Sequence, residues 1–147
     1  MLKEQLQQDL KNALKSGDSK KRMVLGMVMS VIKNKEIEKR GELSEEDIIA
    51  VVSSEIKKRR DSVEQYEKGG RPELAEQEKK EAEMLMAYMP EQMSEDEIRA
   101  EVKKVIGETG AKDMKEMGKV IGAVMAKVKG KAAGQMVTQL VKEELAL

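Results

Sequence analysis

The chain has 147 residues, with 28 basic and 28 acidic side chains, no formal net charge, and neither cysteine nor histidine. These absences exclude disulfides, thiolate metal sites, thiol nucleophiles and the usual general base. We therefore expect no catalytic residue, no metal ligand and no cofactor, and overall neutrality argues against a nucleic-acid binder with a strongly basic surface throughout.

The interior must be aliphatic, because Tyr66 and Tyr88 are the only aromatic residues. Twelve methionines accompany the leucines, isoleucines and valines. Methionine suits irregular gaps, so we favour core filling for these residues over a promiscuous binding groove. No stretch of apolar residues is long enough to cross a membrane and the N-terminus lacks a signal-peptide core, so we expect a cytoplasmic protein without a membrane partner.

Helical periodicity predicts three helices in the first 70 residues. The first ends at Ser16-Gly17, the second runs over residues 20–40 and is closed by Gly41, and the third follows the N-cap Ser44 and ends at Gly69-Gly70. We expect the second and third to form an antiparallel hairpin, because a short loop joins them. Opposite charges four residues apart, such as Glu55 and Arg59, predict that the basic run 57–60 is mostly compensated within the third helix.

A fourth helix starts at Pro72, a residue suited to the first helical position, and stops at Tyr88-Met89-Pro90. We place a domain boundary there, between an N-terminal helical hairpin domain over residues 1–90 and a C-terminal three-helix unit over residues 91–147. A capping box at Ser94 starts the fifth helix, which ends between residues 107 and 110. Strand-like alternation is absent throughout, so the predicted fold is all-α.

The stretch from Met114 to Leu145 concentrates features that helix packing alone does not require. No acid stands between Glu116 and Glu143, and this segment carries a net charge of +5. Its five bases are Lys119, Lys127, Lys129, Lys131 and Lys142.

Small residues recur every four positions in this stretch, at Gly118, Gly122 and Ala126, and form a ridge on the sixth helix. A glycine in a helix interior lowers helix stability by about 1 kcal/mol relative to alanine. We therefore expect a partner to approach the helix backbone closely at these glycines and to compensate this cost. A neighbouring helix is the interpretation we favour, and a sugar-phosphate backbone is the alternative. Gly130 breaks the helix and Gly134 restarts it, which leaves amide groups and Lys131 at a helix N-terminus as an anion site. GKAAG is not a P-loop, so nucleotide binding is not expected.

The segment MGKVIGAVMAKVKGKAAG, followed by MVTQLVKEEL, resembles the GatB/YqeY motif. This motif is the small helical tail of the B subunit of the tRNA-dependent amidotransferase, shared with stand-alone YqeY-like proteins. Residues 56–81 and 88–98 are also similar to the stand-alone family, so the resemblance covers nearly the whole chain. Two departures stand out: the family usually has an acid where Ala133 stands and a base near Gly26.

Three hypotheses about function follow. The first, implied by the resemblance, is an auxiliary factor that contacts tRNA by shape and phosphate, with an amidotransferase or aminoacyl-tRNA synthetase complex as a further partner. The second is the carbon–nitrogen ligase that the family name suggests, using glutamine as amide donor, but the residues for glutamine hydrolysis and an ATP loop are missing. The third is a helical protein-interaction module without RNA binding. The candidate RNA-contacting residues are Gly118, Lys119, Gly122, Lys127, Lys129, Gly130, Lys131 and Gly134.

Overall fold

A computed structural model describes all 147 residues, which form seven α-helices, one short 3₁₀-helix and no strand. The all-α prediction is confirmed. The elements are α1 (Leu2–Ser16), α2 (Ser19–Lys39), α3 (Glu45–Lys68), α4 (Pro72–Met86), α5 (Glu95–Thr109), η1 (Met114–Glu116), α6 (Met117–Lys127) and α7 (Gly134–Leu145). The chain divides into two compact units, Met1–Met89 and Pro90–Leu147. That this division separates an N-terminal domain over residues 1–90 from a C-terminal domain over residues 91–147 stays a prediction.

The helix ends follow from local chemistry. The predicted N-cap at Ser44 forms as part of a capping box with Asp47, and in the predicted box at the start of α5 Ser94 and Glu97 satisfy each other's backbone amides. Gly17 ends α1 in the left-handed conformation, with φ 76°. The end of α2 differs from expectation, because Arg40 and not Gly41 adopts the left-handed conformation, with φ 59°. The Gly41 amide still closes the helix by donating to the Glu36 carbonyl at 3.1 Å.

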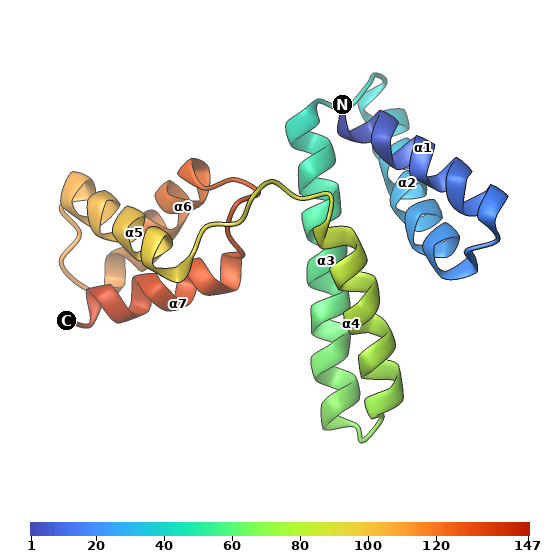
Figure 1. The fold of residues 1–147 in the computed structure, drawn as a ribbon. Coiled ribbons are helices and arrows are strands. Elements are labelled where there is room, and N and C mark those ends of the chain that lie inside the picture. The colour runs from blue at the N-terminus through green and yellow to red at the C-terminus, as the bar shows by residue number, and fades with distance from the viewer. The chain divides into compact units, whose positions relative to one another are not determined.

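Helix pairing in the first unit differs from the expected hairpin of α2 and α3. Figure 1 shows α4 lying beside the C-terminal part of α3, while α1 packs along α2, and the contact between α2 and α3 is smaller. The reversal after α3 is made by Gly69 and Gly70, where Gly70 has φ 70° and the Arg71 amide donates to the Tyr66 carbonyl at 2.8 Å. One consequence is that part of α2 remains uncovered.

The cores are built from leucine, isoleucine and valine, and the expectation that methionine fills them is wrong. None of the twelve methionines is buried. Seven are partly buried at the edges of the two cores, and five are exposed. Branched side chains with few rotamers fill the regular helix interfaces, so the flexible thioether chains remain at the edges.

The second unit is a three-helix arrangement of α5, α6 and α7 around a valine-rich core. Arg99 of α5 joins α7 through Glu143 at 2.8 Å and Glu144 at 2.9 Å. These carboxylates raise the pKa of Arg99, so the guanidinium is charged at every accessible pH. This ion-pair network holds the C-terminal half of α7 against α5.

Candidate nucleic-acid interface

The surface that the sequence singles out is built on α6. Its buried face consists of Val120 and Val124, which are fully excluded from solvent and pack into the core of the second unit. Gly118 and Gly122 lie two positions before these valines, which places them about 200° away around the helix. The glycines therefore lie on the side of α6 that faces away from the core.

The glycine ridge is exposed and bare. A Cβ atom added to either Gly118 or Gly122 would meet no heavy atom within 4 Å. Ala126 continues the same exposed row. The favoured interpretation, that the ridge packs against a neighbouring helix, is therefore wrong for the helices of its own unit. The physical reason is that α5 and α7 both contact the valine face, which leaves the opposite face of α6 uncovered.

The lysines of the acid-free segment separate into two groups. Lys119, Lys129, Lys131 and Lys142 are exposed, and none forms an ion pair with an acid of the chain. Lys127 instead donates to the Glu108 carboxylate of α5 at 2.9 Å. That hydrogen bond raises the pKa of Lys127 and lowers the pKa of Glu108. Of the four lysines proposed for RNA contact, Lys127 is thus already engaged within the protein.

Helical register separates the same residues around α6. Lys119 is adjacent to the ridge, whereas Lys127 lies roughly 180° from Gly118 on the side of the helix toward α5. Lys129 and Lys131 follow the end of the helix, in the turn that leads to α7. The predicted lysines therefore do not all converge beside the ridge.

The turn after α6 is held by the segment that precedes α5. The Met93 amide donates to the Lys131 carbonyl at 2.8 Å, and the Gln92 side-chain amide donates to the Gly130 carbonyl at 2.8 Å. Gly130 has φ 71°, a conformation that favours glycine. Sequence reasoning missed these contacts, because they join residues 38 positions apart without a local pattern.

The N-terminus of α7 has no side-chain cap. Ala133 occupies the N-cap position with extended backbone angles, and it offers no side-chain acceptor to the first-turn amides. Gly134 is the first helical residue and is exposed. Alanine in place of the family's usual acid therefore leaves α7 without a side-chain cap. The unsatisfied amides add to the positive character of this end of the unit.

Comparison with known proteins identifies the family. The sequence matches the family described as Yqey-like protein over residues 3–145, and the chain belongs to this family. It is similar to the altered inheritance of mitochondria protein 41, mitochondrial, of three yeasts. The protein of Lachancea thermotolerans is 35% identical over 106 residues, which are 70% of this chain and 57% of the relative. Identity to that of Vanderwaltozyma polyspora is 32% over 111 residues, 74% of this chain and 60% of the relative.

The protein of Kluyveromyces lactis is 36% identical over 84 residues, 56% of this chain and 45% of the relative. The chain spans about half of the length of the curated relatives that it matches. No helix of the chain combines the length and the apolar character that a membrane crossing requires.

Proposed function

We propose that the protein is an auxiliary factor related to tRNA-dependent amidotransferases, and that it contacts folded tRNA by shape and phosphate through α6 and the turn that follows. The observation that carries this proposal is the bare, exposed backbone along Gly118 and Gly122 with unpaired lysines beside it and beyond its end. The resemblance of this segment to the amidotransferase tail supports it further.

Binding of a phosphate backbone requires positive charge on the protein and a helix surface that the backbone can approach closely. Lys119, Lys129 and Lys131 supply cations to phosphates, and the glycines let a sugar-phosphate backbone approach the helix without steric hindrance. Single-stranded RNA is read by stacking on aromatic side chains, yet Tyr66 and Tyr88 both belong to the first unit and Tyr88 is buried. The proposed recognition is therefore of folded RNA and does not depend on base sequence.

The lysines are tested by charge reversal. We expect K119E/K129E/K131E to weaken binding of folded tRNA by more than about tenfold at low salt, because affinity depends on the number of neutralised phosphates. The matched control is K33E/K35E/K57E, which changes the charge by the same six units at exposed lysines of the first unit without ion pairs. Fluorescence anisotropy between about 50 and about 200 mM salt measures both. Equal losses in the two variants would contradict a local site.

The ridge is tested by filling it. Gly122→Leu places a side chain in open space and restores helix propensity, so the variant should fold at least as stably as the wild type. We expect it to lose tRNA affinity, whereas Gly107→Leu, at an exposed and equally open position of α5, should retain it. Circular dichroism melting separates loss of binding from loss of structure.

A second candidate function is docking of a protein on the same surface of α6. Met114 is 45% exposed, and Met117, Ile121 and Met125 are partly exposed along the other edge of the glycine ridge. An apolar edge of this kind suits a helix of an amidotransferase or aminoacyl-tRNA synthetase complex. A wild-type protein without tRNA affinity at about 50 mM salt would favour this second function.

Intrinsic catalysis is not part of the proposal. Amide release from glutamine requires an activated nucleophile, and cysteine and histidine are absent from the chain. We expect purified protein given glutamine, ATP and misacylated tRNA to release no ammonia and to transfer no amide above background. Turnover that disappears when one of the protein's own residues is mutated would contradict this expectation. The relatives carry a mitochondrial name, whereas the sequence predicts a cytoplasmic protein, and tRNA is present in both compartments.

A further inference from the structure

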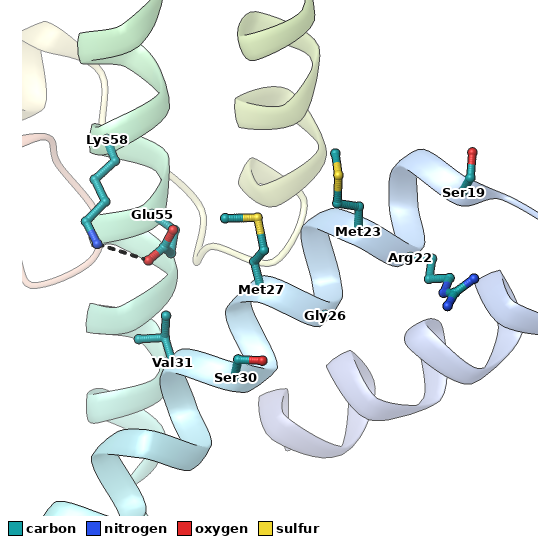
Figure 2. A pocket seen from close by; sticks show the side chains of 9 residues that line it. All are labelled: Ser19, Arg22, Met23, Gly26, Met27, Ser30, Val31, Glu55 and Lys58. Atoms are coloured by element: carbon teal, nitrogen blue, oxygen red, sulfur yellow. Dashed lines mark hydrogen bonds and ion pairs between the residues drawn. The ribbon is translucent and has the colours of Figure 1, made fainter.

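A groove of about 830 Å³ runs along α2 in the first unit (Figure 2). Its lining includes Met23, Gly26, Met27 and Ser30 from α2, and Glu55 and Lys58 from α3. It exists because α3 packs mainly on α4, so that this face of α2 is left uncovered. A Cβ atom added to Gly26 would meet nothing within 4 Å, which makes the middle of the groove open to a partner.

Helix α2 has a broad apolar arc, and the core covers only part of it. Val24, Leu25, Val28 and Ile32 are fully buried in the core. Met23 and Met27, one turn apart on the groove side, are 49% and 51% exposed. An apolar arc wider than the surface that the core covers leaves exposed apolar side chains at its edge, and such side chains beside a groove mark a candidate interaction site.

A buried ion cluster that is incompletely satisfied lies behind Met27 and Glu55, which both line the groove. Arg59 is 6% exposed, and its Nη1 donates to the Glu55 carboxylate at 3.1 Å. Its Nε is buried without a hydrogen-bond partner, and the nearest Glu81 oxygen lies at 3.8 Å. Its Nη2 contacts the Met27 sulfur at 3.9 Å, although a thioether is a weak acceptor.

Charge on the lining indicates what would complete this cluster. Arg22 and Lys58 line the groove with positive charge. Glu55, the only acid of the lining, is already paired with both Lys58 at 3.3 Å and Arg59 at 3.1 Å. Met27 is a flexible side chain that touches the guanidinium from the groove side. A carboxylate in place of the Met27 sulfur would accept a much stronger, charge-assisted hydrogen bond.

We propose that this groove docks an acidic amphipathic helix of a partner protein. The apolar side of the partner lies over Gly26 between Met23 and Met27, and one of its carboxylates reaches Arg59 as Met27 moves aside. The lining residues of α2 lie between positions 19 and 31, a stretch of about 18 Å, which is the length of a three-turn helix. The proposal is independent of tRNA binding, which would use the second unit.

A peptide selection tests this proposal. The probe is a displayed library of helical 16-residue peptides, selected on full-length wild-type protein and counter-selected on Gly26→Leu. This variant fills the groove at an open helical position, so its melting temperature should not fall. We expect the surviving peptides to combine an apolar stripe with several acids, and to shift the methyl resonances of Met23 and Met27 in ¹³C-methyl-methionine spectra.

Binding of a selected peptide should weaken at least tenfold in Gly26→Leu and remain unchanged in Gly107→Leu, the open-position control of the second unit. The same peptide with its acids changed to lysine should not bind. The proposal would be overturned if the selected peptides showed no excess of acidic residues, or if none of them bound Gly26→Leu more weakly than the wild type. Concentration-dependent dimerisation that shifts Met23 and Met27 would overturn it in favour of a second copy of this chain, and tRNA-induced shifts of the same methyl groups would overturn it in favour of RNA.

Discussion

Helices α2 and α6 both present a glycine in open space beside methionines, yet their surroundings differ. Gly26 lies in a groove between two exposed methionines, with charged side chains on the lining and a buried arginine behind Met27. Gly122 lies on an uncovered helix face, with unpaired lysines next to it and past the helix end. A bare helical glycine therefore shows only that a partner can approach closely. The chemistry around the glycine indicates whether that partner is a protein helix or a phosphate backbone.

The largest expected effect concerns the ion cluster beneath the groove. Arg59→Met removes the cation beside the buried Glu81 and leaves the buried Glu55 with Lys58 alone, and we expect it to lower the free energy of unfolding at neutral pH by about 3 kcal/mol. Arg60→Met, at the exposed neighbouring position, should have almost no effect. Urea unfolding measures both. A loss below about 1 kcal/mol would show that the cluster is solvated and would weaken the contrast with α6.

The pH dependence of the Arg59→Met variant sharpens this prediction. Burial, reinforced by Glu78, already raises the pKa of Glu81 above its ordinary value, and loss of Arg59 should raise it further. An acid with a raised folded-state pKa stabilises the fold in its protonated form, and this stabilisation is lost as pH rises through that pKa. The difference in free energy of unfolding between the wild type and the variant should therefore shrink as the pH is lowered from 7 toward the pKa of Glu81. A constant deficit over that range would contradict this assignment.

An intermediate effect is expected at the start of α7. Ala133→Asp supplies the missing cap in a backbone conformation that already suits it, so the free energy of unfolding should rise by about 1 kcal/mol. The new carboxylate also places negative charge two positions after Lys131. We expect tRNA affinity to fall while peptide binding in the groove of the first unit stays the same. Ala133→Ser, which caps the helix without adding charge, should raise the free energy of unfolding and leave tRNA affinity unchanged.

The smallest effect is expected for Lys127. Its ion pair with Glu108 is at the surface, so Lys127→Met should change the free energy of unfolding little. This pair lowers the pKa of Glu108. Its contribution to the free energy of unfolding is therefore present above the ordinary pKa of a glutamate and is lost as the pH falls through the lowered pKa. Lys127→Met should weaken tRNA binding less than Lys129→Met. A larger loss of tRNA binding in Lys127→Met than in Lys129→Met would instead indicate that Lys127 contacts RNA.

The ends of the helices could be predicted from the sequence because their causes are local. Ser94 and Glu97 are three residues apart, and Gly17 needs no partner to adopt a left-handed conformation. The exception is Arg40, where the general preference for glycine pointed to the next residue. The face of α6 that is buried was also predictable, since Val120 and Val124 follow the helical period.

Helix pairing and the state of individual side chains could not be predicted in the same way. The choice of α4 over α2 as the main partner of α3 depends on surfaces distant in sequence. The same holds for Lys127, whose partner Glu108 is 19 residues away. Spacing of four residues identified the pair Glu55 and Arg59, yet it gave no information about their burial. The groove on α2 arises from these non-local choices.

The most direct measurement uses the methionines as probes of both helices at once. Full-length protein labelled with ¹³C-methyl-methionine carries Met114, Met117 and Met125 along or next to α6, and Met23 and Met27 along α2. Folded tRNA added at low salt should shift the three signals at α6, leave the two signals of α2 in place, and produce no shift in the K119E/K129E/K131E variant. Shifts at Met23 and Met27 alone, or no shifts in the wild type, would contradict the assignment of RNA contact to α6.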